Sequence, residues 1–226
     1  LRIAAGAYLD VDPSELLAGF RARHDGTRVI GEAFLSDSLD NGAGYCLELA
    51  KQEHIEALLA QLDPRVKDSM AARWVSIENA GATSGHGSQC DTSCHNCLRD
   101  YYNSGYHGIL DWRLALDMAA IITNRSARMT LDITAEAGQN HWSRLVHGPN
   151  SPINSILKSL NYESHSEGFQ GLSTYARTAG KRLLVERHPL WSQHPQWQQA
   201  MTDALIAFPG YAINDLNPFI ALRRIS

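Results

Sequence analysis

The chain has 226 residues, 44% of them hydrophobic and 19% charged, and its net charge at pH 7 is −4. This length suits one compact domain or two small ones, and the slightly acidic charge excludes a strongly basic nucleic-acid-binding protein. The apolar runs are too short to cross a bilayer and no secretory signal is visible, so we expect a cytoplasmic protein with no membrane partner. Because the chain begins at Leu1 within an apolar stretch, we also expect a fragment of a longer protein.

In the first half, Asp12 followed by Pro13 indicates a helix start and predicts a short helix over 14–20. The run TRVIGEAFL at 27–35 predicts a strand, and a polar loop with glycines follows it. Apolar residues at helical spacing predict one long helix over 45–62. The stretch 79–96, rich in Gly, Ser and Thr, is expected to be a loop.

In the second half, Asp111 is expected to cap a buried helix over 112–123. The expected elements after it are a strand near 129–133, helices at 139–146 and 152–160, a strand at 181–187, a helix at 195–208, and short extended pieces near 211–213 and 219–222. We therefore predict an α+β fold, with mixed helices and short strands around a structural zinc site. A soft boundary near 124–128 predicts two parts, 1–124 and a packed α+β extension, 125–226.

Three of the four cysteines, Cys90, Cys94 and Cys97, lie within eight residues. Two residues separate Cys94 from Cys97, the spacing that lets two thiolates bind one ion. A closed zinc site needs a fourth ligand, and Cys46 is the natural one, to be brought in by the fold. The alternative fourth ligands are His86, His95 and His107. A redox Cys-x-x-Cys pair or ordinary buried thiols are the other interpretations; a catalytic zinc would instead keep one position open to water.

The run CDTSCHNCLRDYYNSGYHGILDWRLALD, residues 90–117, resembles the zinc-binding segment of the MrfA-type (MZB) domain, which lies at the C-terminal end of many bacterial superfamily II DNA helicases. The subgroup that it resembles is that of phage-defence helicases of the DISARM and Druantia kind. The stretches LDVDPSEL at 9–16, FLSDSLDNGAGYC at 34–46 and HPLW at 188–191 agree with the same family. The resemblance is specific over 34–120 and loose after 125. It implies four cysteine ligands, including Cys46.

The resemblance implies an accessory module rather than the motor itself. No G-x-x-x-x-G-K-[ST] run is present, and no acidic pair follows an apolar strand, so this piece lacks the motifs with which helicases bind ATP. We expect ATP chemistry only in motor domains elsewhere in the parent chain. The expected partners are DNA, those motor domains and a defence-system subunit.

The residues with suitable chemistry for a DNA backbone are Arg99, Tyr101, His107 and Arg113. The alternative interpretation is structural: Arg99 pairs with Asp100, and Tyr101 or Tyr102 packs on the zinc loop. Asp132 and Glu186 raise a second possibility, a metal-dependent nuclease, which would need both carboxylates side by side in an open cleft. A third is a zinc-stabilised protein-interaction module without DNA. We predict the first function, a C-terminal zinc-binding accessory domain of an ATP-dependent DNA helicase or translocase, with no catalytic residues of its own.

Overall fold

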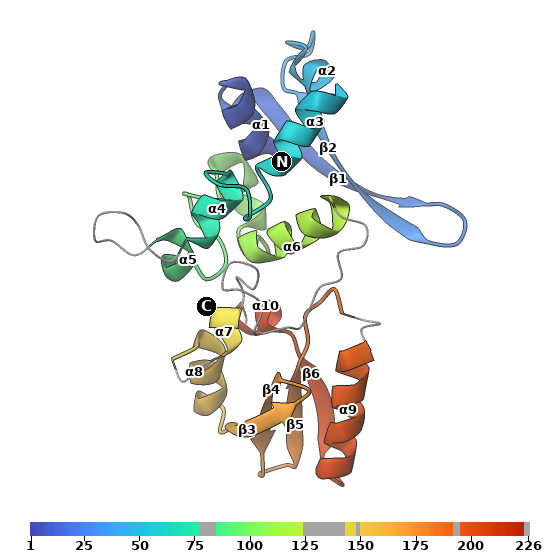
Figure 1. Ribbon diagram of the computed structural model, residues 1–226, viewed down its shortest axis with the longest axis vertical. Helices are drawn as coiled ribbons and strands as arrows, with labels where there is room; N and C mark the ends of the chain where they lie inside the picture. The colour runs from blue at the N-terminus through green and yellow to red at the C-terminus, as the bar shows by residue number, and fades with distance from the viewer. Residues whose placement is uncertain (77–84, 124–142, 148–149, 192–194, 224–226) are drawn as a thin grey trace. The chain divides into compact units, whose positions relative to one another are not determined.

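A computed structural model describes residues 1–76, 85–123, 143–147, 150–191 and 195–223 (Figure 1). The chain divides into two compact units, Leu1–Arg73 and Trp74–Ser226. The boundary predicted near residue 124 lies among residues outside the described part. Helices and strands both contribute substantially, so the α+β class predicted from the sequence is confirmed. No helix among the described residues is long and apolar enough to cross a membrane.

The first unit combines one hairpin with short helices. Its elements are α1 (Arg2–Leu9), the 3₁₀ turn η1 (Pro13–Glu15), β1 (Leu16–His24), β2 (Val29–Asp37), α2 (Tyr45–Leu49) and α3 (Gln52–Ala60), and α4 (Met70–Val75) contains the boundary between the units. Strands β1 and β2 pair antiparallel over nine residues each and form a two-stranded ribbon (Figure 1). Most of their side chains are exposed.

The helix predicted over 14–20 is wrong. Asp12 does cap a helical turn, with Oδ1 accepting the N–H of Ser14 at 2.7 Å, but the turn ends at Glu15 and the chain continues as β1. The turn at Asp25 joins β1 to β2, and Asp25 Oδ1 accepts the N–H of Arg28 at 3.0 Å. The local helix signal is confined to the turn at Pro13–Glu15. The residues after it are extended because they pair with β2.

The long helix predicted over 45–62 is two helices in the structure. Lys51, between α2 and α3, has extended backbone angles (φ −68°, ψ 140°). Residues 51–54 are all polar. The apolar stripe is therefore interrupted at the point where the helix breaks, because no side chain there gains from burial.

The second unit contains the cysteine segment and a four-stranded sheet. Its elements are α5 (His86–Gln89), the 3₁₀ segment η2 (Tyr101–Tyr106), α6 (Trp112–Thr123), α7 (Ser143–Val146), α8 (Pro152–Ser159), β3 (Glu163–Phe169), β4 (Leu172–Arg177), β5 (Arg182–Glu186), α9 (Pro195–Ala207), β6 (Ala212–Leu216) and α10 (Pro218–Ala221). The sheet order is β3-β4-β5-β6, antiparallel except for the parallel pair β5–β6, which α9 connects. A parallel pair requires such a crossover.

The core of this unit joins the sheet to its helices. Ile153 and Leu157 from α8 and Ala200 from α9 are buried in one cluster with Leu183 and Val185 from β5. In α8 and α9 most of the buried residues are apolar and recur at helical spacing. The same spacing is what predicts these two helices from the sequence.

Most predictions for this unit are confirmed, but two are wrong at least in part, and the first is the loop expected over 79–96, which contains helix α5. The helices at 112–123, 152–160 and 195–208 and the strand at 181–187 are present within one or two residues. The extended piece predicted near 219–222 is helix α10, which Asn217 caps by accepting the N–H of Phe219. Strands β3 and β4 are not predicted from the sequence, because β3 (ESHSEGF) is too polar to give a strand signal. The strand predicted near 129–133 lies outside the described residues.

Candidate metal centre

Four potential ligands meet in the second unit: His86, Cys90, Cys94 and Cys97. One ligand atom from each lies within 4.8 Å of all the others. Helix α5 contributes His86, and the loop after α5 contributes the three cysteines. The cluster therefore has one histidine and three cysteines, a donor set that could hold a metal ion such as zinc.

The separations between ligand atoms fit tetrahedral coordination. With Zn–S bonds of about 2.3 Å and Zn–N bonds of about 2.05 Å, tetrahedral angles require Sγ–Sγ separations of about 3.8 Å and an Sγ–N separation of about 3.5 Å. The Sγ atoms of Cys94 and Cys97 are 3.8 Å apart, and those of Cys90 and Cys97 are 4.0 Å apart. Nε2 of His86 is 3.5 Å from Sγ of Cys94. An ion fits between these atoms with little movement of the side chains.

The ring of His86 is held in the orientation that a ligand needs. Its Nδ1 lies 3.0 Å from the carbonyl oxygen of Trp74. Since a carbonyl can only accept, Nδ1 carries the proton and Nε2 keeps its lone pair, directed toward Cys94. The ring also packs edge-on against Trp112, with 5.2 Å between centroids. Such outer hydrogen bonds fix the tautomer and position of metal-bound histidines.

The thiols themselves form an environment that favours a bound cation. The hydrogen bond from Cys90, with help from the backbone N–H of Cys94 at 3.1 Å, lowers the pKa of Cys97 to about 5. The hydrogen bond to Cys97 and burial raise the pKa of Cys90 above its usual range. The hydrogen bond between the two sulfurs therefore favours the thiolate form of Cys97 over that of Cys90. An ion with two positive charges would replace the remaining thiol protons and allow all three sulfurs to ionise.

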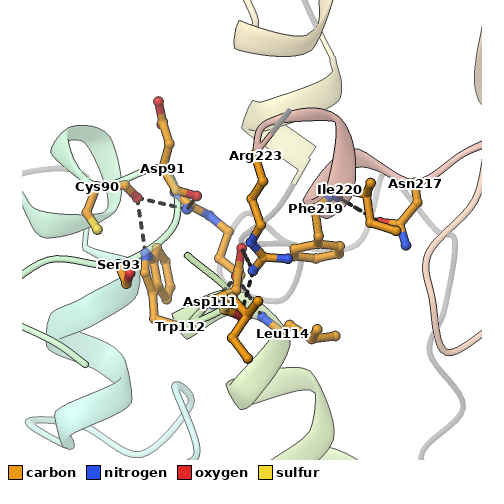
Figure 2. A network of polar contacts seen from close by, with 12 residues as sticks. Cys90, Asp91, Ser93, Asp111, Trp112, Leu114, Asn217, Phe219, Ile220 and Arg223 are labelled. Carbon is orange, nitrogen blue, oxygen red and sulfur yellow. Dashed lines mark hydrogen bonds and ion pairs between the residues drawn. The ribbon is translucent and has the colours of Figure 1, made fainter. Parts of the chain in front are cut away.

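Two side chains in the first turn of α6 hold the cysteine loop, and Figure 2 shows Trp112 beside Cys90. The indole N–H of Trp112 donates to the carbonyl of Cys90 at 3.0 Å, and the guanidinium of Arg113 donates to the carbonyls of Gly87, Cys90 and Asp91 at 2.7–2.9 Å. Arg113 is completely buried. Its side chain therefore satisfies backbone carbonyls of a polar loop, which would otherwise be left without donors inside the protein.

Asp111 fixes the start of α6 and connects it to the end of the chain. Its Oδ1 accepts the N–H groups of Arg113 and Leu114, as expected of a helix cap. Arg223 donates to the carbonyl of Ile109 at 3.0 Å and lies 3.5 Å from Asp111 Oδ2. Figure 2 shows the side chains of Arg223 and Asp111 directed toward each other. Burial raises the pKa of Asp111 to about 6 despite these partners.

Of the four cysteines predicted to bind zinc, the structure brings Cys90, Cys94 and Cys97 together. Cys46 lies in the first unit, at the start of α2, where Asp37 Oδ1 accepts its backbone N–H at 2.9 Å. Burial and the Asp37 carboxylate raise the pKa of the Cys46 thiol to about 11. His86 occupies the fourth place in the cluster. Its assignment was open from the sequence, although its spacing of four residues from Cys90 puts both on one face of a helical turn.

The predicted nucleic-acid contacts lie in different environments. Arg113 is buried, so it is not part of any surface that the chain presents. Arg99 is partly exposed, and its Nε–H donates to the hydroxyl of Ser93 at 2.9 Å. Tyr101 is 86% exposed, and its neighbour Tyr102 is 79% exposed.

The backbone that carries the two tyrosines is firmly held. Asp100 and Asn103 exchange backbone and side-chain hydrogen bonds at the start of η2, and the side chain of Asn103 donates to the carbonyl of Leu98 at 2.7 Å. His107 Nε2–H donates to the carbonyl of Asp100 at 3.0 Å. Side-chain hydrogen bonds therefore fix a short segment that has exposed aromatic rings but no core beneath them.

The nuclease interpretation needs two carboxylates, and the structure describes one of them. Asp132 lies outside the described residues. Glu186, at the end of β5, is completely buried, and its Oε2 accepts the backbone N–H of Ser173 at 2.9 Å. A side chain without exposed surface does not match the solvent-open cleft that this interpretation requires.

No protein-family model and no solved structure matches the chain. The chain is similar to the Druantia protein DruE of Escherichia coli (strain UMEA 4076-1), with 32% identity over 123 residues. The similar stretch is 52% of this chain and 6% of DruE, so the chain spans only a small part of the length of that relative.

Proposed function

We propose that this chain is a zinc-stabilised accessory module of a larger bacterial ATP-dependent DNA helicase or translocase that serves in anti-phage defence. The cluster of His86 with Cys90, Cys94 and Cys97 carries the proposal, because it lies in the segment that resembles the MZB domain. The similarity to a Druantia protein supports the same subgroup. ATP binding belongs to motor domains elsewhere in the parent, and the module works in the cytoplasm.

In this proposal zinc is structural, and His86 is its fourth ligand in place of Cys46. Four protein ligands leave no position for water, so the ion stabilises the fold rather than activating a substrate. The loop from His86 to Cys97 is short and polar and buries few apolar side chains. Binding free energy of the metal would therefore supply much of its stability.

The exposed tyrosines of η2 support a role in contacting DNA. Tyr101 and Tyr102 pack edge to face, with ring centroids 5.6 Å apart, on the rigid segment beside the metal loop. Aromatic rings that are exposed and held in place can stack on unpaired bases, a contact that tolerates any sequence. Arg99 adds a cation on the same segment. Because the whole chain is slightly acidic, we expect it to bind DNA weakly. This binding would add to the DNA affinity of the motor domains rather than replace it.

Metal analysis and a DNA-binding titration on the same sample test this function. We expect about one zinc per chain, as a four-ligand site requires, and binding of single-stranded DNA that weakens between low and moderate salt. Zinc without any DNA binding would instead indicate a structural or partner-docking module. Absence of bound zinc would contradict the assignment of the cysteine segment, and the proposed family with it.

A further inference from the structure

The ribbon of β1 and β2 has two faces of different chemical character. Successive side chains of a strand point to opposite faces and directly paired residues share a face, so the register assigns each position to one of them. One face carries Arg21, Arg23 and Glu32, and oxygens of the Glu32 carboxylate lie 2.7 Å and 2.8 Å from the Nε atoms of the two arginines. The other, which we call the apolar face, has no Asp, Glu, Lys or Arg from position 18 to position 35. Apart from His24 and Gly31, its residues are Ala18, Phe20, Ala22, Val29, Ala33 and Leu35.

The apolar face is exposed along most of its length. Phe20 is 68% exposed and Val29 is 70% exposed. The alanines of the face are exposed as well, whereas Leu16, at the other end of the ribbon, is completely buried. Figure 1 shows the turn end of the ribbon extending away from α1, α2 and α3 of the same unit. Single exposed apolar side chains are common, but a continuous apolar face typically marks an interaction surface.

The ribbon keeps a fixed shape although it has only two strands. Side chains at Gly31 and Gly19 would clash with the rings of Phe20 and Phe34 respectively, so each ring lies across a glycine of the opposite strand. An aromatic ring that covers a cross-strand glycine stabilises the pairing and its register. An isolated two-stranded ribbon is nevertheless only marginally stable in water, and it gains stability when its apolar face packs against another element. The apolar face is therefore preorganised for a partner.

The size of the apolar face indicates which kind of partner it fits. Nine-residue strands are about 30 Å long and two of them are about 10 Å wide, so the face covers roughly 300 Å². Separate proteins that associate stably bury about 800 Å² each, so this face alone would not hold a second copy of the chain or a free partner. A domain of the same polypeptide needs less area, because the connecting chain keeps its effective concentration high.

The charge of the ribbon argues for a protein partner rather than a nucleic acid. Residues 16–37 contain three arginines and three acidic residues, so these charges cancel. Contacts with phosphates need cations, and the apolar face presents neither lysine nor arginine. Its small apolar side chains instead suit close packing against a helix or sheet whose own surface is apolar and uncharged.

We propose that the apolar face docks onto an uncharged, apolar surface of a motor domain in the same parent chain. The inference rests on the proposed function, which places motor domains elsewhere in that chain, and it names the surface through which the module attaches to them. The similar stretch is 6% of DruE, so most of that relative's polypeptide lies outside it. The face with Arg21, Arg23 and Glu32 stays in contact with solvent when the apolar face is covered.

Thiol labelling at two adjacent positions of the purified parent protein tests the proposal. Ala22 and Arg23 are both exposed, lie near the same turn and point to opposite faces of the ribbon. The reaction of each cysteine variant with a maleimide is measured in the folded parent and divided by its rate in urea. We expect this normalised rate to be about tenfold or more lower for Ala22→Cys than for the matched control Arg23→Cys, because the docked face must open before the thiol can react. Peptide mass spectrometry distinguishes the introduced thiol from the natural cysteines.

A photoreactive phenylalanine analogue in place of Phe20 identifies the partner. Cross-links from this position to peptides of the motor domains would support the docking surface. Cross-links to a second copy or to another protein would overturn it, and so would equal normalised labelling rates at the two cysteine positions. Protection of Ala22→Cys that disappears when the parent is diluted would also overturn it, because dilution separates copies but not domains of one chain.

Zinc content and DNA-stimulated ATP hydrolysis, measured on the same preparations, test the proposed function separately. Circular dichroism shows that each variant keeps the native fold. A parent that contains zinc and hydrolyses ATP but reacts equally at both positions loses only the docking surface. A parent without zinc or without ATP hydrolysis would contradict the proposed function, and this inference with it.

Discussion

Nε2 of His86 lies 3.5 Å from Sγ of Cys94, on the side of the imidazole opposite to the hydrogen bond with Trp74. The backbone of one element thus orients a ring toward the thiols of the next loop. This relationship turns a three-cysteine segment into a four-ligand site within a single unit of the protein. It also makes the identity of the fourth ligand a direct experimental question.

Substituting His86 should remove the metal. We expect His86→Ala to contain well under half of the zinc of the natural chain after exposure to a mild chelator, because three ligands leave a position open to competing molecules. Cys46→Ser, the matched control, should keep about one zinc per chain, as a complete four-ligand site predicts. Elemental analysis measures both. Loss of zinc from Cys46→Ser with retention in His86→Ala would restore the four-cysteine assignment.

Loss of zinc should unfold the cysteine loop. Cys94→Ser removes a ligand, and we expect it to lose the ion and to lower the melting temperature in the same way as chelation of the natural chain. Differential scanning calorimetry with and without chelator measures the effect. A Cys94→Ser variant that keeps stoichiometric zinc and the native transition would contradict the metal centre.

Arg113→Lys separates a structural arginine from a DNA contact. Lysine keeps the charge but cannot reach three carbonyls at once, so we expect a loss of about 2–4 kcal/mol in the free energy of unfolding. Urea denaturation measures this loss. If Arg113 acted mainly on DNA, stability would be unchanged and only binding would fall. Arg99→Lys, at a partly exposed position, is the control for the substitution itself.

Glu186 should make stability fall as pH rises. The pKa of Glu186 is raised to about 7 in the folded protein from an ordinary value of 4.5, so between these values the folded state keeps a proton that the unfolded state has lost. The stabilisation that exists below pH 4.5 is therefore lost progressively up to and above pH 7, by about 3 kcal/mol in total. Urea denaturation at a series of pH values from 5 to 8 measures this slope.

Glu186→Gln should flatten that pH dependence, because an amide does not ionise and still accepts the N–H of Ser173. A variant with the same slope as the natural chain would assign the pH effect to other groups.

The two exposed tyrosines should contribute to binding of single-stranded DNA without affecting the metal. We expect Tyr101→Ala combined with Tyr102→Ala to weaken binding by about tenfold or more, from about 1–3 kcal/mol of stacking per base, while zinc content stays unchanged. Leu205→Ala combined with Ile206→Ala, at exposed apolar positions of α9, is the control. Fluorescence anisotropy with a labelled oligonucleotide measures both, and equal affinities would remove the tyrosines from the DNA surface.

The sequence alone determined the features whose signals are local. The spacing of Cys90, Cys94 and Cys97 indicated a metal site, and Asp111 with its apolar stripe predicted α6 within a residue. A pair of cysteines with two residues between them and a capped amphipathic helix need no distant partner to be recognised. The same holds for α8 and α9, whose apolar faces follow the helical period.

Only the tertiary structure decided the features that depend on distant segments. Residues after Glu15 became a strand because β2 pairs with them, and His86 became the candidate ligand because the carbonyl of Trp74 orients its ring. Arg113 has the chemistry of a phosphate contact, yet its burial against three carbonyls gives it a structural role. The sequence specifies which hydrogen-bond donors and charges a side chain has. Whether these groups contact solvent, backbone or another side chain depends on how remote parts of the chain pack.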